Sequence, residues 1–325
     1  SKHHPRLQVR LHDPMPPSLL LKNCATCCIR QSKVFSFTNP IFLYLCKCKN
    51  KLNIRYTKEA IEIIIATMNR DSLDFLIPMF PFAHFSDFSI LIVNQTHENA
   101  ILTSDFPTVK VINSFEIGLS NSRNLGLKNS QGEILILADD DEVFEPDFIE
   151  IISNAYEHFP DAAVISFQIE NENRKLFKKY PKKSQKFLKP LTLFSVMSIE
   201  ITINKAILET SRIEFDTLFG LGATFEMGEE AIFLMDLYRQ QQQISFVPKV
   251  IASHDTQTTI DKVSFLQRYY IQGAFLKRVG MNNWVFRVLQ KVFYDVKQQK
   301  IRLKEIPKAI QLAFNGRKKY LELTQ

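Results

Sequence analysis

Short apolar runs alternate with segments of helical periodicity from about residue 58 onward. The first run, AIEIIIATMNR, is rich in β-branched residues and ends in a polar turn at Thr67–Arg70. Further strands are predicted where the chain reads FSILIVNQT, TVKVIN, EILILADDDE and AAVISFQI. Helices are predicted over residues 71–79 and over GLSNSRNLGLKNS and PDFIEIISNAYEHF, where Pro146 suits a first helical turn. Strands that alternate with helices predict a mainly parallel sheet covered on both faces.

The first 57 residues differ from the rest of the chain. They carry scattered Pro, Lys and Arg without sustained periodicity, and they hold all five cysteines. An odd number of cysteines argues against a disulfide framework, and the adjacent Cys27 and Cys28 do not fit paired CxxC zinc motifs. We therefore predict a poorly ordered extension over 1–57, an α/β domain over 58–261 and a C-terminal helical segment over 262–325.

Length and composition indicate the class of protein. With 325 residues, 45% of them hydrophobic and 23% charged, the chain resembles an ordinary globular enzyme. No stretch approaches the roughly 18–20 apolar residues of a membrane span, and the N-terminus lacks the pattern of a secretory signal. The sequence therefore predicts a cytoplasmic chain.

A basic segment covers residues 174–189. It reads RKLFKKYPKKSQKFLK, with eight Lys or Arg and no acid, in a chain of net charge +7. One interpretation is a flexible solvated loop; the other is attraction to anionic lipid headgroups or a phosphorylated substrate. No zinc-finger spacing or RNA-binding signature accompanies the segment, so nucleic acid is not an expected partner.

The C-terminal segment contains an amphipathic pattern in WVFRVLQKVFYDV. Apolar positions at helical spacing are Val285, Val288, Leu289, Val292, Phe293 and Val296. Such a stripe either packs against the same protein or, with a basic rim, rests on a membrane surface. An anionic membrane surface is thus a candidate partner through residues 174–189 and 262–325.

Four consecutive acids, Asp139–Glu142, end one of the predicted strands. Ligands of open α/β sheets bind outside the carboxyl ends of the strands, so these side chains are expected to reach a crevice. A divalent cation would neutralise them, and oxygen ligands suit Mg²⁺ or Mn²⁺. An EF-hand is excluded by Val143 and Phe144, and P-loop and dinucleotide-binding motifs are absent. An acidic turn that caps the next helix is the alternative.

Several motifs occur in the order seen in family 2 glycosyltransferases. They are IIIATMNR, SNSRNLGLKNSQGEILILADDDEVFEPDF, GEEAIFLMDLYRQQQQISFVP and IASHD, and the chain resembles the family over roughly residues 58–260. The resemblance implies an α/β fold of GT-A type, with a Rossmann-like nucleotide-sugar half over 58–160 and an acceptor half over 161–261. It also implies an inverting, metal-dependent transfer from a nucleotide-diphosphate sugar to a saccharide or lipid-linked acceptor.

The resemblance assigns roles to residues that match its motifs. Asp139 and Asp141 match the ends of the DxD motif, which places Asp139 near the donor ribose and Asp141 on the metal. Both are candidate ligands of Mn²⁺ or Mg²⁺. Thr67 and Arg70 match positions that hold the nucleotide. Arg123 matches the arginine of the SRN segment, a donor contact, although a helix-surface arginine is the alternative.

Four further positions complete the candidate site. Asn94 stands where the family usually has a base-reading aspartate; it can accept from uracil N3–H or donate to cytosine N3, and the family favours uridine. Glu230 matches the catalytic base that takes the acceptor's proton, and its neighbour Glu229 is the substitute. His254 is either a packed histidine or a further metal ligand.

The resulting expectation is a cytoplasmic enzyme, peripheral on the inner face of the cell membrane. It would add a sugar, with UDP-sugar as the favoured donor, in the synthesis of a cell-surface polysaccharide such as capsule or lipopolysaccharide. Two alternatives stay open: an inactive peripheral-membrane adaptor with the same fold, and a sugar nucleotidyltransferase. The Gly-rich loop that the latter requires is missing after Ile65.

Overall fold

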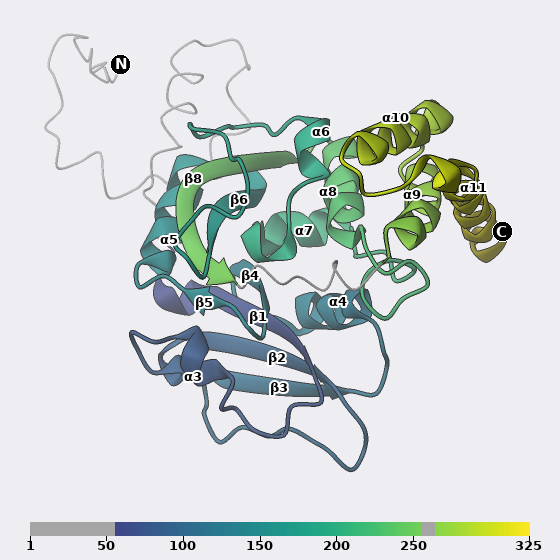
Figure 1. Ribbon diagram of the computed structural model, residues 1–325. Coiled ribbons are helices and arrows are strands. Elements are labelled where there is room, and N and C mark those ends of the chain that lie inside the picture. The colour runs from purple at the N-terminus through teal and green to yellow at the C-terminus, as the bar shows by residue number, and fades with distance from the viewer. Residues whose placement is uncertain (1–55, 255–263) are drawn as a thin grey trace, which may run out of the picture. The chain divides into compact units, whose positions relative to one another are not determined.

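The computed structural model describes residues 56–254 and 264–325 (Figure 1). The expectations for residues 1–55, including those for the five cysteines, lie outside the described residues. None of the described helices combines the length and hydrophobicity that crossing a bilayer requires.

An eight-stranded sheet forms the centre of the fold, in the order β3-β2-β1-β4-β7-β6-β8-β5. The strands are β1 (Ile61–Met68), β2 (Ser89–Gln95), β3 (Val109–Ser114), β4 (Ile134–Asp139), β5 (Val143–Phe144), β6 (Ala162–Asn171), β7 (Ile201–Asn204) and β8 (Gln243–His254). Strands β3, β2, β1 and β4 are parallel neighbours, as are β6 and β8. The short strand β7 is antiparallel to its neighbours β4 and β6, and the short strand β5 is antiparallel to β8. The prediction of a mainly parallel sheet is confirmed.

Helices flank this sheet and extend the chain toward its C-terminus (Figure 1). They are α3 (Leu76–Met79), α4 (Leu119–Asn129), α5 (Phe148–His158), α6 (Pro190–Leu193), α7 (Lys205–Ser211), α8 (Glu229–Arg239), α9 (Phe265–Arg278), α10 (Trp284–Lys297) and α11 (Ile306–Thr324). Short 3₁₀ turns cover Lys58–Ala60, Phe85–Asp87, Ser198–Glu200 and Leu303–Glu305. The helix expected over residues 71–79 is reduced to the one turn of α3, in a stretch that contains the helix-breaking Pro78.

Alternation along the central strands produces a core on each face of the sheet. In β1, Ile63 and Ile65 join one buried cluster, with Phe148 of α5, while Ile64 joins the other, with Phe233 of α8. Helix α4 lies so close to β1 that a Cβ atom at Gly126 would come within 2.5 Å of the Ile64 side chain. The sheet is therefore covered on both faces, as predicted from its continuous apolar strands.

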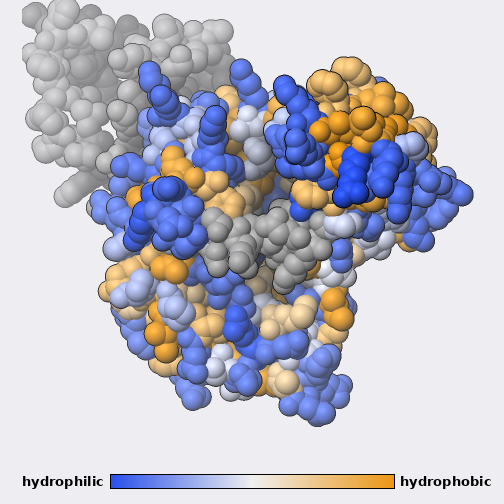
Figure 2. Space-filling model, viewed as in Figure 1, coloured by the Kyte–Doolittle hydropathy of each residue, from blue (hydrophilic) through white to orange (hydrophobic). Residues whose placement is uncertain are grey.

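The C-terminal helices form a third apolar cluster around Tyr269 of α9. Helices α9 and α11 cross closely: a Cβ atom at Gly273 would lie 1.8 Å from a carbonyl oxygen of α11. The predicted stripe of α10 is divided between two environments. Val288 and Val292 are buried, whereas Leu289 and Phe293 are exposed, Phe293 by 73%. An apolar patch is accordingly visible over the C-terminal helices at the upper right of Figure 2.

Candidate functional site

The candidate site lies at the carboxyl ends of the parallel strands β1, β2 and β4. Because these strands are hydrogen-bonded neighbours, their last residues lie side by side, with Thr67 opposite Asn94 and Ala66 opposite Asp139. Side chains that leave the apolar core here meet at one edge of the sheet. The sheet therefore brings together residues that lie far apart in the sequence.

Asp140 connects the first strand to the acidic run. The Thr67 hydroxyl donates a hydrogen bond to Asp140, and Nε and Nη2 of Arg70 each lie 2.8 Å from the same carboxylate oxygen. The motif assigns Asp140 no role, because this residue occupies its variable middle position. In the structure it anchors both residues expected to hold the nucleotide.

Arg123 is the buried centre of a cluster of carboxylates. Its side chain is only 3% exposed, and its Nη1 lies 3.1 Å from Oε1 of both Glu229 and Glu230. Its Nη2 lies 3.4 Å from Oδ1 of Asp139. Burial alone would lower the pKa of Arg123, but the charges of Glu230, Asp139 and Glu229 outweigh it and raise that pKa. Arg123 thus ties α4 to α8 and to the end of β4, and it is not a surface arginine.

The two glutamates at the start of α8 have different environments. Glu229 is buried, and burial together with the charge of Glu230 raises its pKa to about 8, although Arg123 opposes the shift. Glu229 therefore holds its proton at neutral pH. Glu230 has the greater solvent exposure of the two side chains. This difference favours Glu230 as the carboxylate that can reach an acceptor.

Asp141 faces His254, the last residue of β8. Its Oδ1 lies 3.1 Å from Nε2 of the imidazole, and the Asp141 side chain is 60% exposed. The hydrogen bond from His254 is the main cause that lowers the pKa of Asp141, against the effect of burial. The structure therefore brings together two of the candidate metal ligands, and Asp139 lies on the same short run.

A preformed group of three His, Cys, Asp or Glu side chains that could hold a metal ion is not found among the described residues. The donors present still suit Mn²⁺ or Mg²⁺, because Asp141 offers an exposed carboxylate and His254 an imidazole. Mg²⁺ in phosphate-binding sites commonly takes one or two protein carboxylates and completes its shell with phosphate oxygens and water. Asp141 fits such a partial site.

Glu142, the last acid of the run, points inward. It is buried, and its Oε1 accepts a 2.7 Å hydrogen bond from the backbone N–H of Asp139. Burial raises the pKa of Glu142 well above its ordinary value, and the charge of Asp139 adds to this effect. Glu142 thus points away from the other acids of the run and fixes the turn through its hydrogen bond to Asp139.

Asn94 has a structural role that the sequence did not indicate. It is fully buried; its Oδ1 accepts from the backbone N–H of Arg70 at 3.1 Å, and its Nδ2 donates to Arg70 O at 3.0 Å. Nδ2 also lies 3.2 Å from Asn113 Oδ1. These bonds fix the turn that presents Arg70, and they argue against the expected direct contact between Asn94 and the nucleobase.

The basic segment 174–189 is attached to the fold and is not a free loop. Nζ of Lys178 lies 2.6 Å from Oε1 of the buried Glu200, and the Tyr180 hydroxyl donates to the same atom at 2.9 Å. The backbone N–H of Leu188 donates to β8 at 2.8 Å. The remaining lysines are exposed: Lys175, Lys179, Lys182, Lys183, Lys186 and Lys189.

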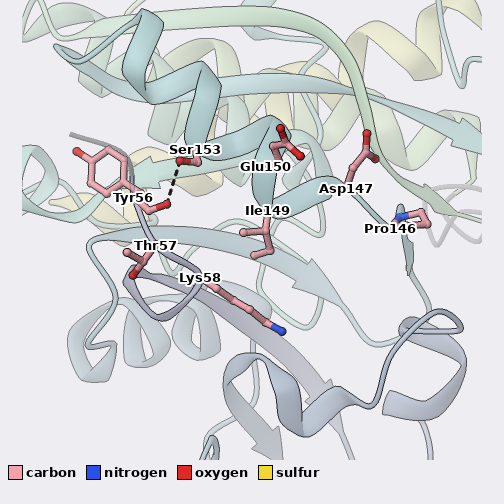
Figure 3. Close-up of a pocket in the computed structure, with 8 residues that line it drawn as sticks. All are labelled: Tyr56, Thr57, Lys58, Pro146, Asp147, Ile149, Glu150 and Ser153. Atoms are coloured by element: carbon pink, nitrogen blue, oxygen red, sulfur yellow. Dashed lines mark hydrogen bonds between the residues drawn. The ribbon is translucent and has the colours of Figure 1, made fainter. Parts of the chain in front are cut away.

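A separate hollow of about 470 Å³ lies beside the start of α5 (Figure 3). Its lining combines Tyr56–Lys58 with residues around the first turns of α5, and Ser153 donates a 2.9 Å hydrogen bond to the carbonyl oxygen of Tyr56. It contains none of the candidate site residues. We therefore do not include it in the site.

Comparisons with known proteins find similar sequences among glycosyltransferases. Residues 62–212 match the family model described as "Glycosyl transferase family 2". "Uncharacterized glycosyltransferase YwdF" of Bacillus subtilis (strain 168) is 29% identical over 123 residues, which cover 35% of this chain and 46% of that protein. An "Uncharacterized glycosyltransferase" of Haemophilus influenzae is 29% identical over 79 residues, covering 23% of this chain and 27% of that protein. The matches thus span less than half the length of these curated relatives.

Solved structures of S. aureus TarS 1-349 share the fold. The complex with UDP-GlcNAc has a TM-score of 0.53 at 16% identity, covering 78% of this chain and 79% of that one. The complex with UDP has a TM-score of 0.52 at 15% identity, covering 81% and 88%. At this identity the likeness concerns the fold alone, and it confirms the expected GT-A-like architecture with additional C-terminal helices.

Proposed function

We propose that the chain is a glycosyltransferase, which transfers a glycosyl group from a nucleoside diphosphate sugar to a hydroxyl acceptor, because residues 62–212 match the model described as "Glycosyl transferase family 2". One observation carries the proposal: buried Arg123 gathers Asp139 and Glu230 at the carboxyl end of β4, next to the exposed Asp141. The proposed donor-side carboxylate and the proposed acceptor-side carboxylate are thereby held by one arginine.

Glu230 is the proposed proton acceptor for an inverting displacement. The acceptor oxygen bonds to the anomeric carbon, the bond from that carbon to the diphosphate oxygen breaks, and the electron pair leaves with the diphosphate. The acceptor's hydroxyl proton moves to Glu230. Its contact with Arg123 orients the carboxylate, and neutral Glu229 avoids a second negative charge beside it.

The donor would bind along the ends of β1 and β4. Thr67, Arg70 and Asp139 border the proposed nucleoside position, and Asp141 with His254 would hold Mn²⁺ or Mg²⁺ beside the diphosphate. When bound, such an ion withdraws charge from the departing diphosphate. A UDP-sugar is the proposed donor, because the TarS structure of similar fold is described in complex with UDP-GlcNAc.

We further propose a saccharide or lipid-linked acceptor and a role in cell-surface polysaccharide synthesis at the cytoplasmic face of a membrane. The exposed lysines of 174–189 and the apolar face of α10 support a surface of anionic lipid as partner. Capsule and lipopolysaccharide are the classes of product considered. These proposals are independent of the donor chemistry.

The test is a panel of nucleoside diphosphate sugars with Mn²⁺, Mg²⁺ or chelator, followed by donor calorimetry and by release of nucleoside diphosphate. One sugar should bind and be turned over in a metal-dependent way. Glu230→Gln should lower turnover by about 10²–10⁴-fold and leave donor affinity within about twofold, because it removes only the proton acceptor. Glu226→Gln, an exposed glutamate before the same helix, is the matched control.

Three outcomes would contradict the proposal. Failure of every donor to bind would favour the inactive adaptor. Consumption of a sugar phosphate and a nucleoside triphosphate would favour the nucleotidyltransferase. Full activity of Glu230→Gln alongside an inactive Glu229→Gln would move the proton acceptor to Glu229.

A further inference from the structure

A cavity of about 490 Å³ lies between α6, α8, α9 and α10, outside the site described above. Each helix contributes one face; α9, for instance, turns Arg268, Gln272 and Phe275 toward it at helical spacing. The apolar lining residues are Leu191, Phe194, Met227, Ala231, Ile271, Phe275, Leu276 and Met281. This volume falls in the range of small-molecule sites.

All the charged side chains in the lining are positive. Arg268, Arg287 and Lys291 border the cavity, and none of its described lining residues is acidic. Lys291 is paired with Asp295 at 2.8 Å, a residue outside the lining. Arg287 makes no ion pair within the described residues, and its Nη1 lies 3.4 Å from the neutral Gln290. An anionic group would therefore complement this wall.

Two buried polar atoms in the lining are left without a hydrogen-bond partner among the described residues: Nε of Arg287 and Oε1 of Gln272. A buried group of this kind destabilises the fold unless a ligand or water satisfies it. Nε requires an acceptor and Oε1 requires a donor. A phosphate ester next to a hydroxyl would satisfy both, whereas a plain hydrocarbon would satisfy neither.

The position of the cavity relates it to the acceptor. Met227 and Gly228 in its wall directly precede Glu229 and Glu230, and Ala231 follows them. The opposite wall is α10, whose outer face carries the exposed Leu289 and Phe293. A ligand in the cavity thus lies against the first turn of the helix that carries Glu230, although Glu230 itself is not part of the lining.

We infer that this cavity binds the phosphate-bearing apolar end of the acceptor, that is, a phosphate ester carried on a hydrocarbon chain. The inference rests on the proposed function, because it makes the occupant the acceptor of the transfer. Arg287 contacts the phosphate, Gln272 accepts from a neighbouring hydroxyl, and the apolar walls take the first part of the chain.

The probe is monomeric dioctanoyl phosphatidic acid, below its micelle concentration, titrated into the full chain. Trp284, the single tryptophan, lies in the first turn of α10 and reports binding by fluorescence; calorimetry gives the stoichiometry. We expect saturable one-to-one binding that Arg287→Gln weakens at least about tenfold, the loss of one charge-assisted hydrogen bond. Arg287→Lys should fall between. Lys297→Gln, an exposed cation of the same helix outside the lining, should bind as the parent does.

Comparison ligands identify which part of the probe is recognised. If dioctanoylglycerol binds as tightly as the phosphatidic acid, the phosphate does not contribute to binding. If inorganic phosphate binds as tightly, the hydrocarbon chains do not contribute. Either result overturns the inference. Binding to anionic vesicles without saturable binding of the monomer would also overturn it, since the cations would then serve a bilayer surface. Unfolding curves confirm that each variant is folded.

A separate donor titration distinguishes this failure from failure of the proposed function. Donor binding that persists while the lipid phosphate does not bind overturns the cavity inference alone. Loss of donor binding in the parent chain would overturn the proposed function, whatever the lipid result.

Discussion

Replacing Arg123 with Met tests whether charge holds the site together. The change keeps an apolar stem beside the Phe215 ring but removes the cation that lies 3.1 Å from Glu229, 3.1 Å from Glu230 and 3.4 Å from Asp139. Removing one partner of a buried ion pair typically costs about 3–5 kcal/mol, because the other charge stays buried and unpaired.

Protonation limits that cost in this cluster. Glu229 already holds a proton at neutral pH, since its pKa is raised to about 8, and burial also raises the pKa of Asp139. Without Arg123 a carboxylate can avoid being a buried unpaired charge by binding a proton. At pH 7, protonation of a glutamate of ordinary pKa costs about 3–4 kcal/mol. Between pH 7 and pH 5 that cost falls by up to about 2.7 kcal/mol for each proton bound.

The sign follows from the raised pKa of the folded carboxylates. A folded state that binds more protons than the unfolded state loses stability as pH rises. The free energy of unfolding lost in Arg123→Met should therefore be small at pH 5 and approach about 3–5 kcal/mol at pH 8. In the double variant with Glu230→Gln the loss at pH 8 should shrink, because one of the unpaired charges is gone.

Urea unfolding at pH 5, 7 and 8 measures this difference. Arg174→Met is the control, because Arg174 pairs with Glu145 on the surface, where an ion pair contributes less than about 1 kcal/mol. An equal loss at pH 5 and pH 8, or a loss no larger than that of the control, would refute the view that Arg123 holds unpaired carboxylates together.

Four further changes test other parts of the chain. Asp141→Asn should abolish Mn²⁺-dependent donor binding in calorimetry and shift unfolding by less than about 1 kcal/mol, since the Asp141 side chain is 60% exposed; normal metal-dependent binding would remove it from the site. Gly273→Ala should cost at least about 1–3 kcal/mol in urea unfolding, because its Cβ would lie 1.8 Å from a carbonyl oxygen of α11, and an unchanged midpoint would contradict this crossing. Lys178→Gln should destabilise the fold by leaving buried Glu200 unpaired. Gln at the exposed lysines should instead weaken binding to anionic vesicles at low salt, and unchanged binding would exclude the segment as a membrane contact. These lysines are Lys179, Lys182, Lys183 and Lys186.

Regular elements were predictable because periodicity is a local property. The strands β1 and β4 and the helices α4 and α5 carry continuous apolar runs or helical repeats, and each was placed within a few residues of its observed bounds. The antiparallel strand β7 was missed: it has only four residues, Ile201–Asn204, too few to show a period. The sequence also did not show that half of the α10 stripe is exposed, because periodicity does not tell which apolar residues pack against another element.

The site residues were predicted from motifs that resemble those of a glycosyltransferase family, and this assigned Thr67 and the acidic run to one site. The structure has Thr67 in contact with Asp140 of that run. The network beneath could not be derived in this way, since Arg123 and Glu229 lie 106 residues apart and join two helices. Pairing between elements depends on tertiary packing, on which local patterns carry no information.

The acidic run shows why this distinction matters for the metal. The clustered carboxylates suggested that a cation must neutralise them. In the fold, however, each of these side chains already has a protein partner or is buried. Asp140 pairs with Arg70, Asp139 pairs with Arg123, and burial raises the pKa of Glu142 well above its ordinary value. Asp141, 60% exposed, is bonded to a histidine. We therefore expect that a divalent ion is not needed to fold this turn: apo protein should be folded, and metal should bind together with a diphosphate donor.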